Sequence, residues 1–531
     1  MNTHTRTYNA VKNATISLSI QLITLVVSFV GRTIFIKVLG DQYLGISGLY
    51  TNILSVLSLA DLGITTVMTF SLYKPIAEND TERIGSLMAY FKKMYRCIAL
   101  AIFALGMAVV PFLTFIVKGS ELPVAELRIY YVIFLLNSVC SYLVVYKTTL
   151  IQADQRVFIL KIASFIARMV TEAALIVILL LTGNYFLYLV ISILITLLKN
   201  IALSLIADKL YPFLRKKKAV KVADDQQKQI VDNIKSLFIY RISAMIMNST
   251  DNILISVILG TVIVGYYSNY LVIITALNTF IMLLAQSVLS SIGNHNASED
   301  TKHKLGLFRV LILIFTFIGT FSVCCFQTVF NDFIYLWIGK DNPSYILSSL
   351  DVACISFNFF VSCIMNPIWM YREATGMFKK TRYSMTVAAI LNIVLSVVLG
   401  NLMGLGGIIA ATALAKLLTN FWYEPIVLYR DVFECKLRGY WFYMLRMILC
   451  AGLTIASSVL ACVFIPVGIG FMFLKIAING VCTVFVFAIL NIKAPEIKMI
   501  TGIAKKYLKK AKKDVYKKGD CLKCHSLKTK P

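Results

Sequence analysis

The feature that most constrains this chain is a long succession of apolar runs separated by short polar connections. About 20 helical residues cross a hydrocarbon core, so each run is long enough to span a bilayer. The runs do not alternate in the way that the strands of an outer-membrane barrel do. We therefore predict an all-α integral membrane protein with about 14 transmembrane helices, near residues 13–37, 43–73, 95–117, 129–150, 157–182, 185–206, 237–260, 263–290, 307–330, 346–370, 382–400, 404–428, 443–466 and 469–491.

Composition supports membrane insertion. Hydrophobic residues make up 59% of the 531 positions and charged residues only 15%. A soluble domain cannot hide that much apolar surface. The polar start MNTHTRTYNAVKN and the long first run predict that no signal peptide is cleaved.

The basic residues behind the net charge of +26 are distributed unevenly between the two sides of the membrane. With the N-terminus inside, 43 Lys or Arg flank the inner ends of the predicted helices and 4 flank the outer ends. This bias predicts that both termini are cytoplasmic. The excess of Lys and Arg is then explained by its role in orienting the helices, so no nucleic-acid partner is expected.

The chain shows signs of an internal repeat. At an offset of 220 or 221, matching residues are Leu39 and Leu259, Gly40 and Gly260, Gly45 and Gly265, Ala153 and Ala374, and Gly183 and Gly404. Paired repeats of this kind are typical of transporters, which bind their cargo between the halves.

The repeat predicts two six-helix lobes and an addition. The expected divisions are an N-lobe at 1–206, a cytoplasmic amphipathic linker at 207–236, a C-lobe at 237–428, two further helices at 429–492 and a basic cytoplasmic tail at 493–531. The linker and the tail carry lysines beside apolar residues at helical spacing, which predicts binding to anionic membrane lipids.

Ionisable residues within the spans are the strongest pointers to a site, because a charge at that depth normally faces a cavity or the protein interior. Arg32 and Arg241 are expected to meet an anionic cargo, since guanidinium stays charged and grips phosphate through paired N–H groups. Snorkelling to the interface is the alternative for both. Asp61 and Asp251 are expected either to pair with these arginines or to bind a coupling cation.

Polar residues at helical spacing extend this expected site. The candidate cavity residues are Arg32, Arg241, Lys416, Ser28, Gln21, Asn248 and Asn252, and the candidate ion-coupling residues are Asp61 and Asp251. Hydroxyls and amides can equally bond across packed helices. Arg168 and Glu172, four residues apart, are expected to pair within their helix, and Lys475 is expected to snorkel.

No catalytic set is visible. A P-loop is missing, and the four histidines lie in polar segments. Most of the twelve cysteines lie in apolar runs, as small hydrophobic residues do. The terminal CLKCH motif has no second ligand pair. We expect no enzyme activity, no cofactor and no bound metal.

One stretch carries a family resemblance. RTIFIKVLGDQYLGISGLYTNILSVLSLADLGI, followed by LYKPIAENDTERIGSLMAYFKKMYR, resembles the bacterial polysaccharide-biosynthesis (Wzx-type) flippases. These belong to the multidrug/oligosaccharidyl-lipid/polysaccharide (MOP) exporter superfamily, which includes the MATE transporters. The resemblance implies a V-shaped two-lobed bundle that works by alternating access, in which the cargo site opens to one side of the membrane and then to the other. The implied cargo is an undecaprenyl-pyrophosphate-linked glycan, and the implied partners are polysaccharide assembly proteins.

Three functions stay open. The leading hypothesis is a flippase for lipid-linked oligosaccharide units, in which Arg32 meets the pyrophosphate. The alternatives on the same fold are a lipid II flippase and a small-molecule (drug) antiporter coupled to Na+ or H+. A membrane transferase is disfavoured, since no long outer loop carries paired carboxylates.

Overall fold

The structure is a computed structural model of the chain. It describes residues 3–57, 64–120, 122–154, 156–216, 227, 230–231, 242–243, 245–247, 249–298, 301–340, 342–375, 377–492, 494–497, 499 and 501. Of the predicted candidates, Asp61, Arg241 and Asn248 lie outside these residues, as do most of the linker and nearly all of the tail.

Every regular element in the described part of the chain is helical, which confirms the predicted fold class. In chain order these elements are α1 (Thr3–Leu39), α2 (Asp41–Leu57), α3 (Ile64–Ala77), α4 (Thr81–Val109), η2 (Val110–Phe112), α5 (Leu113–Ile116), α6 (Val124–Ala153), α7 (Val157–Thr182), α8 (Tyr185–Leu210), α9 (Phe213–Lys216), α11 (Asp251–Leu259), α12 (Thr261–Ser298), α13 (Thr301–Ile334), η3 (Tyr335–Gly339), η4 (Pro343–Tyr345), α14 (Ser349–Thr375), α15 (Phe378–Leu418), α16 (Asn420–Asp431), α17 (Arg438–Cys462) and α18 (Ile469–Asn491).

Ten segments of the described residues are long and apolar enough to cross a membrane. One of them, Tyr383–Asp431, has 49 residues. Gly404 interrupts it with a non-helical φ of 65°. Asn392 donates to Thr412 over 2.8 Å, so the chain folds back at Gly404 and this segment contains two antiparallel helices. The count of fourteen spans stays a prediction.

The chain divides into two compact units. Unit 1 comprises 1–279, 338–347 and 378–419, and unit 2 comprises 280–337, 348–377 and 420–531. The division cuts through α12, so the units are not simply the first and second stretches of the sequence. The predicted lobe boundaries stay a prediction.

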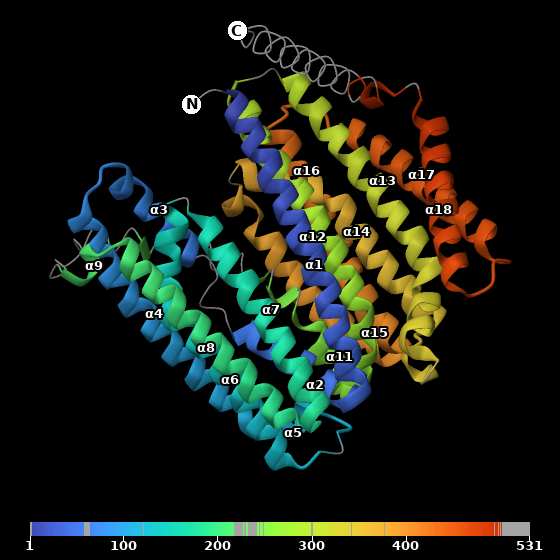
Figure 1. The fold of residues 1–531 in the computed structure, drawn as a ribbon. Coiled ribbons are helices and arrows are strands. Elements are labelled where there is room, and N and C mark those ends of the chain that lie inside the picture. The colour runs from blue at the N-terminus through green and yellow to red at the C-terminus, as the bar shows by residue number, and fades with distance from the viewer. Residues whose placement is uncertain are drawn as a thin grey trace, which may run out of the picture. The chain divides into compact units, whose positions relative to one another are not determined.

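In unit 1, α4, α6, α8 and α7 pack in that order, as Figure 1 shows. Gly106 of α4 admits the Leu135 side chain of α6, because a Cβ there would collide with it. Tyr50 of α2 is fully buried and donates its hydroxyl to the Leu127 carbonyl of α6 over 2.9 Å. These contacts hold α2 to the same layer.

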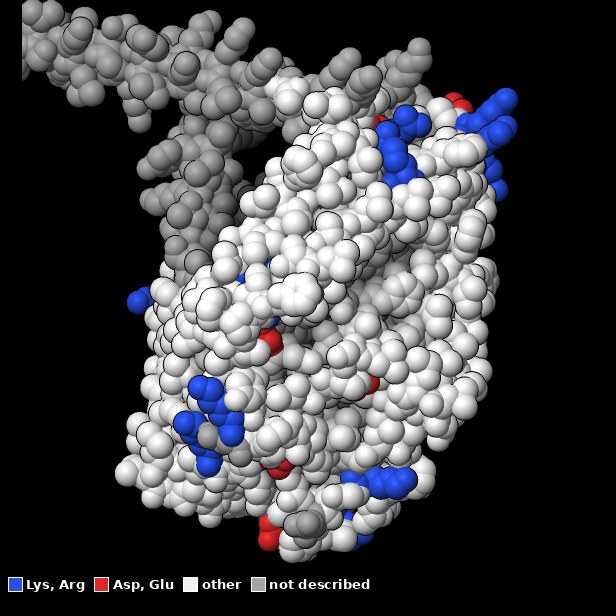
Figure 2. Space-filling model, turned by 90° about the vertical axis from the view of Figure 1, so that its right-hand side faces the viewer, with Lys and Arg blue, Asp and Glu red and all other residues white. Residues whose placement is uncertain are grey.

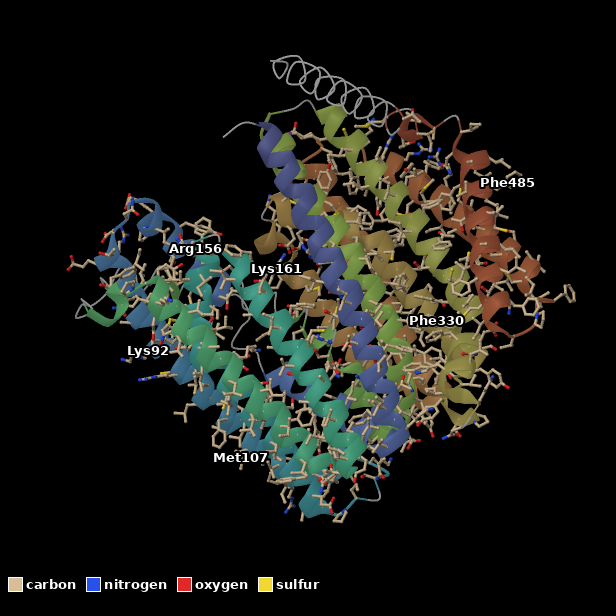
Figure 3. All side chains as sticks on the ribbon, in the orientation of Figure 1. Lys92, Met107, Arg156, Lys161, Phe330 and Phe485 are labelled. Carbon is tan, nitrogen blue, oxygen red and sulfur yellow. The ribbon has the colours of Figure 1, made fainter. Side chains whose placement is uncertain are left out.

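In unit 2, α13 packs against α14, α17 and α18. Gly319 lets α13 approach α14, since a Cβ there would lie 2.8 Å from that of Cys363. The surfaces of α17 and α18 away from α13 carry exposed Leu449, Leu453, Phe473 and Phe485. Figure 3 labels one of these side chains, Phe485. The face drawn in Figure 2 is mostly uncharged, as expected for helices that contact lipid.

Two of the glycine pairs matched by the internal repeat share a positive φ. Gly40 and Gly260 each follow a helix and have φ values of 83° and 103°. Gly183 and Gly404 form the second pair, with φ values of 59° and 65°. Glycine adopts positive φ without a steric penalty, so each pair lets the chain leave the helical conformation at the same place in the repeat. Gly183 and Gly404 differ in ψ, at 14° and −137°, so these two turns are of different kinds.

A third glycine pair forms a reciprocal crossing of α2 and α12, which we name the glycine crossing. A Cβ on Gly45 would collide with the Thr261 carbonyl oxygen, and a Cβ on Gly265 would lie 2.7 Å from the Asp41 carbonyl oxygen. Each contact becomes the other when 220 is added to or subtracted from the residue numbers. The two repeat-related helix starts therefore meet about a local pseudo-twofold axis, backbone against backbone.

The glycine crossing predicts a sharp sensitivity to one methyl group. We expect Gly45→Ala to destabilise the protein by about 1–3 kcal/mol or more, because the backbones of both helices must move apart. Thermal unfolding of the detergent-purified protein should show a clear fall in the melting temperature.

Gly85→Ala is the matched control. Gly85 lies in α4, where a Cβ would have no atom within 4 Å, so alanine there should be neutral or slightly stabilising. Equal melting temperatures for the two variants would contradict the tight crossing.

Candidate functional site

Arg32 lies in α1, about 10 Å from the end of that helix at Leu39. Its side chain crosses to α12. The Nε atom donates to Oδ1 of Asn269 over 3.0 Å, and Nη2 donates to Oγ of Ser268 over 2.5 Å. Both partners are neutral, so these two bonds fix the guanidinium in place without cancelling its positive charge.

The two acceptors are set by the start of α12. Ser268 donates its own hydroxyl hydrogen to the Gly265 carbonyl over 2.6 Å, which leaves its oxygen lone pairs for Arg32. Asn269 is fully buried. Its Nδ2 has no hydrogen-bond partner among the residues described. The amide therefore contributes to this site through its oxygen, which accepts from Arg32.

Two tyrosines complete the surroundings of Arg32. Tyr188 of α8 and Tyr345 of η4 both interact electrostatically with its guanidinium. Tyr345 also packs edge-on against Tyr266 of α12, with 5.2 Å between ring centroids. We name Arg32, Ser268, Asn269, Tyr188 and Tyr345 the Arg32 cluster.

The electrostatic surroundings of Arg32 differ from those of three other cations in the described apolar helices. These three are paired with carboxylates at 2.6 Å: Lys147 with Asp208, Arg372 with Glu424, and Lys475 with Asp332. No carboxylate among the described residues lies within ion-pair distance of Arg32. An isolated charge in an apolar setting needs water or an external anion.

Ser28, one turn before Arg32 on α1, contacts α7. Its hydroxyl donates to Oε1 of Glu172 over 3.2 Å and accepts from Nη2 of Arg168 over 2.9 Å. The expectation of a direct pair within α7 is therefore wrong: the α1 hydroxyl bridges the two. Gly31 makes the approach possible, because a Cβ there would lie 2.6 Å from Glu172 Oε2.

Asp251 belongs to a second polar cluster in unit 1. Thr412 Oγ1 lies 3.1 Å from both carboxylate oxygens of Asp251 and accepts from Nδ2 of Asn392 over 2.8 Å. Lys416 and Tyr267 interact electrostatically with the same carboxylate. We name these five residues the Asp251 cluster.

The structure brings some of the predicted residues together and separates others. Arg32 and Ser28 lie one turn apart, and Asp251 and Lys416 interact. Asn252 is buried on α11, and Gln21 is half-buried on α1. The alternative in which Asp251 pairs with Arg32 is not what the structure shows.

Lys475 corrects another expectation. It does not snorkel, since it is buried and pairs with Asp332 of α13. One turn along α18, Asn479 donates to Thr328 over 2.8 Å. The lysine therefore fastens α18 to α13 within unit 2.

Sequence reasoning missed Asn269, Tyr188, Tyr345 and Asn392. Asn269 follows Ser268, which the polar pattern of its helix does predict. A single amide in an otherwise apolar helix was a usable signal for Asn392. The tyrosines gave none, because 27 tyrosines are spread along the chain.

The contrast between paired and unpaired cations predicts different effects on stability. We expect Asp332→Ala to cost about 3–5 kcal/mol, because it leaves the Lys475 ammonium buried without its counter-charge. Arg32→Met should change stability by about 1 kcal/mol or less, since the lost hydrogen bonds are offset by removal of an uncompensated charge. Melting temperatures of the purified variants provide the measurement.

Adding Lys475→Leu to Asp332→Ala should recover most of the loss. If Arg32→Met unfolds the protein as severely as Asp332→Ala, Arg32 has a structural role.

Comparisons with known proteins agree with this architecture. A family model described as "Polysaccharide biosynthesis protein" matches residues 10–290. No curated protein sequence matches.

Solved structures show the fold. A lipid II flippase MurJ in an inward closed conformation has a TM-score of 0.64 at 15% identity, covering 90% of this chain and 99% of that one. An inward-facing multidrug resistance MATE family transporter of the MOP superfamily has a TM-score of 0.53 at 14% identity, covering 78% and 98%. A MOP superfamily transporter from Pyrococcus furiosus has a TM-score of 0.53 at 13% identity, covering 80% and 95%.

These likenesses and the ten apolar segments identify a multi-pass membrane protein with the fold of the MOP superfamily transporters. The family model spans more than half of the chain. The chain therefore belongs to the polysaccharide biosynthesis protein family.

Proposed function

We propose that this protein is a flippase for undecaprenyl-pyrophosphate-linked oligosaccharide units, which it moves across the cytoplasmic membrane of a bacterium by alternating access. The observation that carries this proposal is the Arg32 guanidinium, held by neutral acceptors and left without a carboxylate among the described residues. The family match supports a lipid-linked glycan as cargo.

The geometry of Arg32 suits a phosphate ligand. Guanidinium carries five N–H donors, of which Ser268 and Asn269 engage two. Three donors, including both on Nη1, have no acceptor among the described residues and can bond to phosphate oxygens. Because charge-assisted bonds of this kind are stronger than neutral ones, a pyrophosphate supplies the missing counter-charge and satisfies the remaining donors together.

A neutral cradle also permits release. A carboxylate beside Arg32 would compete with the cargo for the guanidinium, as Glu424 does for Arg372. The Asn269 and Ser268 oxygens orient the group and leave its charge available. The cargo's apolar chain is best left in the lipid, since each buried CH₂ contributes about 0.8 kcal/mol there.

Topology completes the proposal. The uneven distribution of Lys and Arg supports cytoplasmic termini. In that orientation Arg32 lies toward the periplasmic end of α1, where a cargo loaded from the cytoplasmic leaflet arrives. The partners that follow from this role are polysaccharide assembly proteins on either side of the membrane and anionic lipids around the basic segments.

Two alternatives on the same fold have specific support. A lipid II flippase would use the same pyrophosphate chemistry, and the likeness to MurJ supports its fold. A drug antiporter needs a free carboxylate for cationic drugs. Asp251 serves this need poorly, because it is bonded to Thr412 and faces the charge of Lys416.

Asp251 is better suited to coupling. We propose that Na+ or H+ binds at the Asp251 cluster, where one carboxylate, the Thr412 hydroxyl and the Asn392 amide meet. Oxygen ligands of this kind suit a hard cation. The nearby Lys416 ammonium is an internal competitor, so binding should be weak and reversible.

Arg32 provides the first functional test. We expect Arg32→Gln to reduce the rate of flipping of a fluorescent undecaprenyl-pyrophosphate-linked oligosaccharide in proteoliposomes about 10- to 100-fold, because it removes charge-assisted bonds of about 1.5–3 kcal/mol. Arg32→Lys should retain part of the activity, since lysine keeps the positive charge but lacks the paired N–H donors of the guanidinium.

Lys118→Gln is the matched control, an exposed cation near the same end of unit 1. Full flipping by Arg32→Gln at normal membrane insertion would refute the pyrophosphate contact. Parallel assays with lipid II and with a cationic dye separate the two alternatives.

The Asp251 cluster provides the second test. We expect Asp251→Asn to abolish the stimulation of flipping by an imposed Na+ or H+ gradient, because the cation loses its charged ligand, while binding of the cargo persists. Thr412→Val should weaken the stimulation without abolishing it.

The measurement is the flipping rate with and without each gradient. An Asp251→Asn protein that responds to both gradients as the unchanged protein does would exclude this cluster as the coupling site.

A further inference from the structure

Unit 1 contains two more cations at the middle of long apolar helices. Arg168 lies eleven residues after the start of α7, and Lys199 lies eleven residues before the end of α8. At 1.5 Å per residue, each is about 16 Å or more from either end of its helix. Neither side chain can reach a membrane interface by snorkelling. Lys199, counted from sequence with the basic residues of the inner side, therefore lies at membrane depth.

The two cations share a polar groove between α7 and α8, with a volume of about 380 Å³. The polar residues that line it are Ser164, Arg168, Thr171, Glu172, Thr196 and Lys199. We name this the α7–α8 groove. Three hydroxyls and three charged groups in one groove mark a surface for a hydrated or polar ligand.

Charge in the α7–α8 groove is not balanced. Glu172 is the one carboxylate among its lining residues, against two cations. Arg168 donates to the Ser28 hydroxyl, and Lys199 has no hydrogen bond or ion pair within the described part of the chain. The groove therefore carries an excess of one positive charge at a depth where an unpaired charge is costly in contact with acyl chains.

The remaining residues of α7 show which side meets lipid. Phe158, Ile162, Ile166 and Val170 are exposed at a spacing of four residues, which forms one apolar stripe. Arg168 lies off that stripe. Lys161, which Figure 3 labels on α7, lies seven residues before Arg168 and so on the same face.

We propose that the α7–α8 groove is a second anion site, which binds the phosphate groups of a lipid headgroup before they reach Arg32. This inference rests on the proposed function and adds a second binding site for the cargo's phosphate groups. Arg168 and Lys199 supply the charge, and Ser164, Thr171 and Thr196 supply hydroxyls.

Side-chain interactions link the groove to the Arg32 cluster. Ser28 bonds Arg168 and Glu172 and lies one turn from Arg32, and Tyr188 interacts electrostatically with both Glu172 and Arg32. Lys199 lies eleven residues, or about 16 Å, from Tyr188 along α8. In this proposal a phosphate group passes from Lys199 to Arg168 and then to Arg32.

The shared ligand chemistry has two sources, the pyrophosphate of the cargo and the phosphate of a bilayer phospholipid. The test counts bound lipids by native mass spectrometry of the full chain in detergent, with undecaprenyl pyrophosphate or phosphatidylglycerol as the probe. The variants are Arg168→Gln with Lys199→Gln, and Arg32→Gln alone. Lys209→Gln is the matched control, an exposed lysine of α8 outside the groove.

We expect the unchanged protein and Lys209→Gln to bind two molecules of undecaprenyl pyrophosphate, and each of the other proteins to bind one, with at least about tenfold weaker binding at the altered site. Arg168→Lys with Lys199→Arg keeps both charges and should restore the second molecule, which excludes misfolding as the cause. If only phosphatidylglycerol binding is lost in the double variant, the groove is an anion site for the bilayer.

If the double variant binds both probes as the unchanged protein does, the second site does not exist. If only Arg32→Gln loses undecaprenyl pyrophosphate, the proposed function stands without this inference. If only the double variant loses it, the groove stands and the Arg32 contact does not.

Discussion

The site depends on a guanidinium that neutral groups hold in place, with no carboxylate partner among the described residues. In an apolar surrounding a cation is stable only with a counter-charge, water or oriented dipoles. Arg32 has the last of these from within the protein, in the oxygens of Ser268 and Asn269. Ser268 is oriented by its bond to Gly265 and Asn269 by complete burial. The arrangement resembles an anion receptor in which the receptor's charge is preserved until the anion arrives.

The glycine crossing explains why these groups meet. Gly40 turns the chain from α1 into α2, and Gly45 presses α2 against the start of α12. The crossing therefore fixes the end of α1, which carries Arg32, relative to Gly265. Ser268 and Asn269 follow Gly265 by one turn. A contact between backbones, made possible by two missing methyl groups, thus sets the position of a charged side chain.

Much of this was predictable from sequence, and the failures have a common physical cause. Helical periodicity identifies the face on which Arg32 lies, and turn glycines identify where helices end. Neither identifies a partner that is distant in sequence. Asn269 lies 237 positions from Arg32, and Asp332 lies 143 from Lys475. The four-residue spacing of Arg168 and Glu172 predicted a local pair, but Gly31 lets α1 approach and its serine intervenes. Local rules fail where a third helix comes close.

The cations in the apolar helices fall into two groups, those bonded to a carboxylate and those without a carboxylate partner among the described residues. In unit 2, Arg372 and Lys475 are bonded to carboxylates, and Arg309 lies over the ring of Tyr443. Such cations fasten helices together and offer little to a ligand. Unit 1 also has such a pair, Lys147 with Asp208. Its Arg32 and Lys199, by contrast, have no carboxylate partner among the described residues, and Arg168 reaches Glu172 only through a serine hydroxyl. In the proposed function these cations attract the anionic headgroup of the cargo. The proposed selectivity for a phosphorylated lipid thus depends on where carboxylate partners are missing among the described residues as much as on where arginines are present.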